Sequence, residues 1–207
     1  ASQAFVNPLW GSLSLDLLQQ GIPFEDILSM LKRKDLAREM RQFHGIGKAG
    51  EIVQHTGAEC VNWAGHIKGE NVSVAGNLLM GPHVIEETID AWNANADTEF
   101  AERLLLAMEA GEAAGGDKRG KQAAAIKIYR GQPYPDLDLR VDDHADPLQE
   151  LRRLLRVAHE QYMIFKTGFP TTENFSGMID RHPLDQIIAK VEEERRQQGY
   201  VSSSHAI

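Results

Sequence analysis

A glycine-rich turn near the middle of the chain carries the charged residues best suited to chemistry. Residues 111–122 read GEAAGGDKRGKQ, so Asp117 and Arg119 place opposite charges among closely spaced glycines. Glycine permits positive φ angles and close approach of a backbone, a combination that a packed interior rarely needs. Arg119 could bind a carboxylate through a bidentate pair, and Asp117 could orient a substrate or a catalytic amine. The alternative is a helix C-cap followed by a turn that a structural ion pair stabilises.

Two asparagines are candidate hydrogen-bond donors to a reacting carbonyl group. Asn7 precedes a proline, and Asn77 follows a glycine near the end of an apolar segment. A side-chain amide that is preorganised against an oxyanion contributes about 3 kcal/mol to stabilisation of the transition state. Asparagine beside proline or glycine is also a common turn residue, which is the alternative for both positions.

A second polar cluster, Arg140, Asp142, Asp143 and His144, lies in the last third of the chain. Alternation along a strand would place Arg140 and Asp142 on one face and Asp143 on the other. Carboxylates with a histidine could bind a divalent metal, but a convincing site needs three or four ligands, and the other histidines share no close spacing. We therefore expect no metal or cofactor, and we consider Arg140, Asp143 and His144 as substrate-binding residues. His66, which follows a Trp-Ala-Gly sequence, could line a pocket in the same role or cap a loop.

Helical spacing of apolar residues predicts most of the elements that must position these side chains. A helix over residues 9–20 ends at a glycine, and a second helix begins at Pro23 with an apolar face that includes Leu36. Further helices are expected over residues 83–93, 98–112, 147–158 and 183–198. The last of these is amphipathic, so we expect it to dock on the core or on a second subunit.

Strands are predicted between these helices. Patterns typical of strands cover residues 42–47, 52–56, 72–79, 123–130 and 137–142, and the first two of these read as a hairpin. The intervening stretch 57–69 is polar and reads as irregular. Strands, paired helices and then strands again predict an α+β fold in which two sheets are faced by helices.

Composition excludes several classes of protein. The formal net charge of −8 over 207 residues argues against nucleic acid as the main partner, because phosphate binding needs a basic face. A single cysteine, Cys60, excludes an internal disulfide and a cysteine-rich metal site, so a reducing, cytoplasmic location is the simplest expectation. No apolar run approaches the roughly 18 residues that cross a bilayer, and we expect no membrane partner.

A series of motifs points to a known family. In chain order they are Asn7-Pro8, Trp10-Gly11, Thr56-Gly57 with Cys60, Trp63-Ala64-Gly65-His66, Gly76-Asn77-Leu78-Leu79, residues 113–120 and residues 139–144. This series resembles the bacterial domain of unknown function 1028 family from residue 1 to residue 156. That family is similar in fold to the N-terminal nucleophile hydrolases, so the resemblance implies a four-layer αββα sandwich. It also implies amide-bond hydrolysis, without naming a substrate.

The resemblance also says what the nucleophile should be. In N-terminal nucleophile hydrolases a Thr, Ser or Cys at the start of the mature chain attacks a carbonyl, and its own amine is the general base. Family members usually begin well upstream of the Ala1 position with a strand that opens on Met-Thr, so we expect this segment on a separate chain or in sequence that precedes Ala1. Ser2 is a second candidate, because removal of Ala1 would give it both a hydroxyl and a free amine. An ordinary strand residue is the alternative for Ser2.

These features together predict an amide hydrolase that acts on a small-molecule or peptide-like amide by an N-terminal nucleophile mechanism. The candidate catalytic residues are Ser2, Asn7, Asn77, Asp117 and Arg119. The hydrolase-like domain is expected to span residues 1–158, and residues 159–207 are expected to form a helical extension. A non-catalytic ligand-binding or assembly protein on the same scaffold is the alternative. We expect a homo-oligomer in either case, with or without a separate N-terminal chain.

Overall fold

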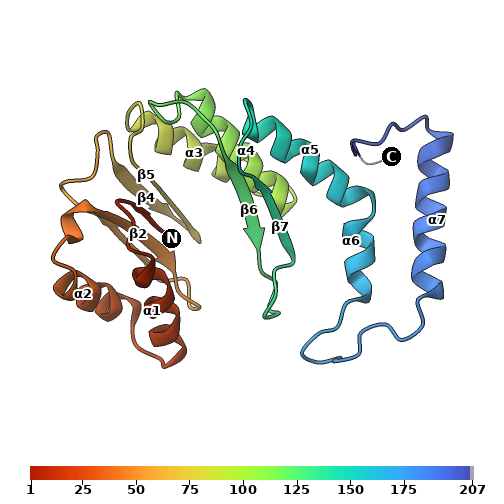
Figure 1. Cartoon of the computed structure of the whole chain (residues 1–207), viewed down its shortest axis with the longest axis horizontal. Coiled ribbons are helices and arrows are strands. Elements are labelled where there is room, and N and C mark those ends of the chain that lie inside the picture. The colour runs from red at the N-terminus through yellow and green to blue at the C-terminus, as the bar shows by residue number, and fades with distance from the viewer. Residues whose placement is uncertain (206–207) are drawn as a thin grey trace. The chain divides into compact units, whose positions relative to one another are not determined.

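The computed structural model describes residues 1–205, and the chain divides into two compact units (Figure 1). The first unit is Ala1–Gly120, and the second begins at Lys121. Each unit has its own antiparallel strands and its own helices, so the expected α+β class is confirmed at this level. The boundary expected after residue 158 stays a prediction, and it falls inside the helix α5 (Pro147–Glu160).

Three strands of the first unit form an antiparallel sheet in the order β1-β2-β3. These strands are β1 (Ser2–Ala4), β2 (Arg41–Ile46) and β3 (Ile52–Thr56). The register pairs Gln42 with Gln3 on one side and with Thr56 on the other. The hairpin that the sequence predicts is therefore confirmed as β2 and β3, and it brings three polar residues to one level of the sheet.

A second antiparallel pair of the first unit joins β4 (Gly65–Gly69) to β5 (Val72–Gly76). The expectation of irregular structure was wrong for β4. Its sequence, GHIKG, has two glycines and one β-branched residue, so its own strand propensity is low. Pairing with β5 at every position of the strand stabilises it instead.

The longer helices of the first unit are α1 (Pro8–Gln19), α2 (Phe24–Lys34), α3 (His83–Ala94) and α4 (Phe100–Ala113), and a short 3₁₀ helix, η1 (Arg38–Met40), precedes β2. Asn7 caps α1 by accepting a hydrogen bond from the backbone N–H of Leu9. The apolar faces of α1 and α2 pack on the first sheet, and the buried core there consists of Trp10, Phe24, Ile27, Leu28, Leu31, Phe43 and Val53.

Leu36 does not belong to the apolar face of α2, where the sequence placed it. Its exposed fraction is 93%. The helix ends at Lys34 and Asp35 is extended, so residue 36 no longer follows the helical period. The carboxylate of Asp35 turns back instead to accept hydrogen bonds from Arg41 and Trp10.

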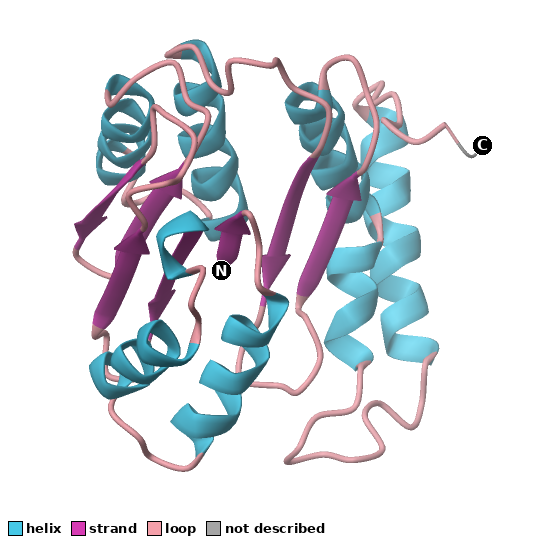
Figure 2. Ribbon diagram, turned by 60° about the vertical axis from the view of Figure 1, so that its left-hand side comes forward, coloured by secondary structure: helices cyan, strands magenta, loops and turns pink. Residues whose placement is uncertain are grey.

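Side chains along β2 and β3 point alternately toward helices α1 and α2 and toward the β4-β5 hairpin. Phe43 and Val53 pack against α1 and α2, whereas Gln42 and Gln54 donate hydrogen bonds to backbone carbonyls of the β4-β5 hairpin. Helix α3 contacts both strands of that hairpin, and α4 packs along α3. The strands of the first unit therefore lie between two pairs of helices (Figures 1 and 2).

The second unit is built on a hairpin of β6 (Ala124–Ile128) and β7 (Leu137–Val141), against which α5 packs. The chain continues through α6 (Tyr162–Phe165), the 3₁₀ helix η2 (Lys166–Gly168) and α7 (His182–Gln197). Helix α7 agrees with the amphipathic helix that the sequence predicts, and it docks through Leu184, which is buried, although Ile187 is exposed. Within residues 1–205, no helix has the length and apolar character that crossing a bilayer requires.

Candidate functional site

A layer of polar side chains lies between the β1-β2-β3 sheet and the β4-β5 hairpin. We call it the inter-sheet polar layer, and its members are Gln3, Gln42, His44, Gln54, Thr56, His66, Ser73 and Asn77. Packed sheets usually bury apolar side chains, because a polar group that loses water without gaining a partner costs free energy. Every buried side-chain nitrogen or oxygen in residues 1–205 has a hydrogen-bond partner, so the layer is a complete network.

Gln42 is the centre of the inter-sheet polar layer and is fully buried, with an exposed fraction of 0%. Its Nε2 lies 2.9 Å from Thr56 Oγ1, 3.0 Å from the Gly65 carbonyl and 2.9 Å from the Gly76 carbonyl. Its Oε1 accepts hydrogen bonds from Gln3 Nε2 at 2.8 Å and from Asn77 Nδ2 at 3.2 Å. Carbonyl oxygens only accept hydrogen bonds, so this arrangement fixes the orientation of the Gln42 amide.

Two hydroxyl–imidazole pairs flank this centre. Thr56 Oγ1 lies 2.7 Å from His66 Nδ1, and Ser73 Oγ lies 2.7 Å from His44 Nδ1. Burial lowers the pKa of His44 to about 4, and burial also lowers the pKa of His66 below its usual value. Both imidazoles are therefore neutral near pH 7. They differ in access, because the pair at His66 is exposed whereas the pair at His44 is partly buried.

The structure places two of the residues singled out from the sequence, Asn77 and His66, in the inter-sheet polar layer. Ser2 and Asn7 lie together elsewhere, because Ser2 Oγ donates to the Asn7 carbonyl at 3.1 Å. The Asn7 side chain caps α1 with its oxygen and donates from Nδ2 to Asp35 at 2.9 Å. Their predicted catalytic roles stay predictions, and the contacts that the structure gives them are structural.

The glycine-rich turn packs beside the backbone that follows Asn77. Asp117 forms an isolated β-bridge with Leu79, and the Lys118 N–H donates to the Leu78 carbonyl at 2.8 Å. The glycines at 115, 116 and 120 have positive φ angles, as the sequence predicts. Arg119 forms an ion pair with Asp117 at 2.6 Å, and its hydrogen bonds lower the pKa of the Asp117 carboxyl. The Arg119 side chain is largely exposed, so its guanidinium group is accessible from solvent.

The second polar cluster belongs to the second unit, and its members have separate partners. Arg140 pairs with Asp142 at 2.7 Å on the surface, and Asp143 accepts a hydrogen bond from Gln122. His144 Nδ1 accepts from the backbone N–H of Asp146, which itself caps α5. These contacts stabilise the entry into α5, and the proposed substrate-binding roles stay predictions. Among the described residues, no three His, Cys, Asp or Glu side chains gather in a group that could hold a metal ion.

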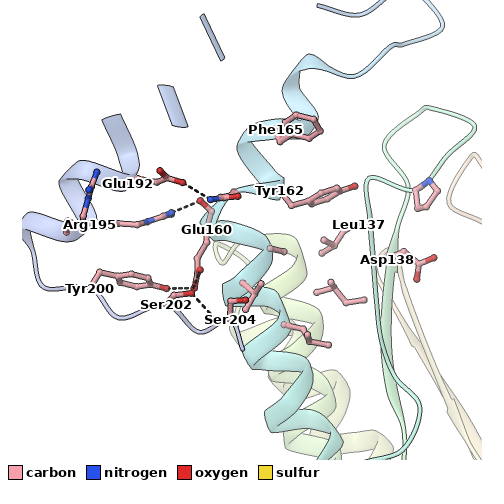
Figure 3. Close-up of a pocket in the computed structure, with 17 residues that line it drawn as sticks. Leu137, Asp138, Glu160, Tyr162, Phe165, Glu192, Arg195, Tyr200, Ser202 and Ser204 are labelled. Atoms are coloured by element: carbon pink, nitrogen blue, oxygen red, sulfur yellow. Dashed lines mark hydrogen bonds between the residues drawn. The ribbon is translucent and has the colours of Figure 1, made fainter. Parts of the chain in front are cut away.

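A cavity of about 920 Å³ opens in the second unit (Figure 3). Strand β7 and helices α5 and α6 supply its apolar wall, which includes Leu137, Leu139, Leu154, Val157, Tyr162 and Phe165. Its volume and apolar lining are typical of sites for small organic ligands.

The charged side chains at the mouth of the cavity all have protein partners. Glu160 accepts hydrogen bonds from Tyr200 Oη at 3.0 Å and from Ser202 Oγ at 2.6 Å. Arg195 donates to the Glu160 carbonyl, and Glu192 accepts from the Gln161 amide (Figure 3). Arg195 also donates to the His159 carbonyl. A charged ligand would have to compete with these existing pairs.

Sequence reasoning missed Gln42 and Thr56, although a signal for them exists. Polar residues alternate at Gln42 and His44 on β2, and again at Gln54 and Thr56 on β3. Such a polar face usually indicates exposure to solvent, because most antiparallel sheets bury one face only. Here the polar face meets a second pair of strands, and only the tertiary structure shows this.

Comparisons with known proteins agree on one family. The family model described as "Family of unknown function (DUF1028)" matches residues 1–151. The crystal structure of protein SPO2555 from Silicibacter pomeroyi, which carries the same family label, is similar with a TM-score of 0.77 and 28% sequence identity. That match covers 87% of this chain and 81% of the other chain. No curated protein matches this sequence. The resemblance read from the motifs is therefore confirmed, and the chain belongs to the DUF1028 family.

Proposed function

We propose that this protein hydrolyses an amide bond and that the inter-sheet polar layer is its catalytic centre. The substrate is a small-molecule or peptide-like amide. The scaffold is a helix, sheet, sheet and helix sandwich of the type found in N-terminal nucleophile hydrolases. Support for this scaffold comes from the first unit, where α1 and α2 pack on one side of the strands and α3 packs on the other.

The observation that carries the proposal is the full burial of Gln42 between the β1-β2-β3 sheet and the β4-β5 hairpin, where it joins an exposed hydroxyl–imidazole pair to an asparagine amide. A polar network in place of an apolar core sacrifices hydrophobic stabilisation. Departures of this kind from ordinary packing are expected at functional sites. The groups that the network assembles, a hydroxyl, a neutral imidazole and amide N–H donors, are those that acyl transfer requires.

In this proposal the side chain of Asn77 donates a hydrogen bond to the oxyanion of the transition state. Its Nδ2 donates one hydrogen bond to Gln42 Oε1, and an amide nitrogen carries two N–H groups. The second N–H can serve a reacting carbonyl while the first holds the side chain in place. Arg119, beside the backbone that follows Asn77, has the role of binding the remainder of the substrate.

Asn77→Ala is expected to lower kcat/KM by about 10²–10³-fold, because it removes one preorganised donor. The assay follows release of p-nitroaniline from a panel of acyl p-nitroanilides. Asn95→Ala is the matched control, since Asn95 donates only to the Ala91 carbonyl at the end of α3 and should keep full turnover. No hydrolysis by the unmodified protein above the buffer rate, or equal turnover in Asn77→Ala, would refute the proposal.

Ligand binding without catalysis is a second candidate function, and the cavity of the second unit is the observation that favours it. Because the charged groups at its mouth are already paired, the expected ligand is neutral and mostly apolar. Nile red, a neutral apolar dye, should gain fluorescence when the protein is added. Leu154→Trp places a larger side chain in the wall and should weaken dye binding about tenfold or more. Unchanged dye affinity in Leu154→Trp would exclude this cavity as the site.

A further inference from the structure

We infer that Thr56 is the nucleophile of the inter-sheet polar layer and that His66 is its general base, an inference that rests on the proposed hydrolase function. The two residues come from neighbouring strands, Thr56 at the end of β3 and His66 in β4. Thr56 Oγ1 and His66 Nδ1 are 2.7 Å apart, within the range expected for a nucleophile and its base. The backbone of both strands fixes the pair, since β3 is paired with β2 and β4 with β5.

The hydrogen-bond network sets the direction of proton transfer. Gln42 Nε2 has two N–H groups, which are shared among Thr56 Oγ1 at 2.9 Å and the carbonyls of Gly65 and Gly76, and it has no lone pair that could accept the Thr56 proton. The hydroxyl proton of Thr56 is then directed to its other neighbour, His66 Nδ1. His66 therefore carries its own proton on Nε2 and presents an unprotonated Nδ1 to the hydroxyl. This is the tautomer that a general base needs.

Access distinguishes this pair from the similar one in the same layer. Thr56 is half-buried, but His66 is exposed and the contact between the two side chains is open to solvent, which is where a substrate carbonyl would approach. Ser73 makes the same contact with His44 and is likewise close to a glutamine amide, that of Gln54, but the Ser73–His44 pair is partly buried. The geometry of the Ser73 pair suits a structural link between β2 and β5.

Other nucleophilic side chains of the first unit are less suited to attack. Cys60 is buried, its thiol donates to the Arg41 carbonyl at 3.3 Å, and burial raises its pKa, so little thiolate forms at neutral pH. Ser2 donates its hydroxyl to the Asn7 carbonyl, which does not accept a proton as a base does. The Thr56 hydroxyl differs from these groups because it contacts a neutral imidazole that is itself exposed.

The reaction proceeds in two steps, acylation of Thr56 and hydrolysis of the acyl ester. Thr56 Oγ1 bonds to the substrate carbonyl carbon while its proton passes to His66 Nδ1. The carbon–nitrogen bond then breaks, His66 gives the proton to the leaving amine, and an acyl ester remains on Thr56. Water then attacks the carbonyl carbon of this ester while His66 takes a proton from the water. Transfer of that proton to Thr56 Oγ1 breaks the ester bond and releases the carboxylic acid.

Stopped-flow kinetics with p-nitrophenyl acetate test this assignment. The unmodified protein should release a burst of p-nitrophenolate close to one equivalent, because the ester on Thr56 forms faster than it is hydrolysed. Thr56→Val keeps the shape of the side chain, and it should abolish the burst and lower turnover about 10³-fold or more. Thr56→Ser restores a hydroxyl and should restore the burst. Thr88→Val is the matched control, since the Thr88 hydroxyl donates only within α3, to the Val84 carbonyl.

The outcomes separate the inference from the proposed function. A burst that persists in Thr56→Val overturns the assignment of Thr56 but leaves the protein a hydrolase. Absence of hydrolysis in the unmodified protein, with both p-nitrophenyl acetate and the anilide panel, overturns the proposed function itself. Circular dichroism checks that each variant is folded, and Thr56→Ala, with the same expected loss, replaces Thr56→Val if the latter is unfolded.

Discussion

Asp35→Ala is expected to lower the free energy of unfolding by about 3–5 kcal/mol, because it leaves the buried guanidinium of Arg41 without its counter-charge. Asp35 and Arg41 are 3.0 Å apart, with side chains only 11% and 10% exposed. The same carboxylate accepts hydrogen bonds of 2.9 Å from Asn7, Trp10 and the backbone N–H of Ala37. Asp35 thus connects α1, the end of α2 and β2.

Urea unfolding measures this effect, and Asp16→Ala, which removes an exposed carboxylate from α1, is the control that should stay close to the unmodified protein. The hydrogen bond from Arg41 holds the pKa of Asp35 well below its usual value of 3.8. A carboxyl whose pKa is lowered on folding stabilises the protein above its unfolded pKa, and this stabilisation is lost as the pH falls further. The difference between Asp35→Ala and the unmodified protein should therefore shrink below about pH 4. A loss below about 1 kcal/mol at pH 7 would show that Asp35 is not a structural centre.

His66→Gln is expected to lower kcat/KM for amide hydrolysis by about 10²–10⁴-fold, because it removes the general base while keeping a polar side chain beside Thr56. The change should also remove the acid limb of the pH profile. Burial, and to a lesser extent the charge of His55, lowers the pKa of His66 from its usual 6.5, so the base is neutral and active at pH 7. In the unmodified protein, activity should therefore fall only below pH 6.5, as His66 is protonated.

The prediction is tested by measuring kcat/KM over a series of pH values for the unmodified protein and for His66→Gln. His159→Gln is the control, because His159 is exposed and lies in α5 of the second unit. Loss of rate without a change in the shape of the pH profile would assign His66 a positioning role. Full activity in His66→Gln would remove it from the catalytic site.

Much of the fold could be predicted because the helices carry complete local signals. Helix α1 has a capping asparagine and a proline at its start, and α5 has Asp146 and Pro147 in the same positions. Helix α5 therefore begins at the predicted residue, and α1 begins one residue before the predicted start. Strand β4 could not be predicted, because its glycines give no local preference and only pairing with β5 stabilises it. The prediction for Leu36 failed because α2 ends at Lys34 and Asp35 is extended, with its carboxylate accepting a hydrogen bond from Arg41.

The candidate site could be predicted only in part. Asn77 and His66 belong to motifs that are recognisable in the sequence, and the structure brings both to Gln42 or to its neighbour Thr56. Gln42 itself has no such motif, because its importance arises from a second pair of strands that covers it. Asn7 was chosen for its chemistry, yet the contacts that the structure shows for it are those of a helix cap. Residue type alone cannot separate these cases, since burial and partners decide between them.

The position of the acyl group during turnover shows whether Thr56 is the nucleophile. After reaction with p-nitrophenyl acetate and an acid quench, trypsin releases residues 49–68 as one peptide, in which Thr56 is the only hydroxyl amino acid. Fragmentation by tandem mass spectrometry should place a single acetyl group on Thr56, which lies in the inter-sheet polar layer. An acetyl group on a residue outside this layer, such as Cys60 in the same peptide or Ser2 in the peptide of residues 1–32, would show that the layer is not the catalytic centre.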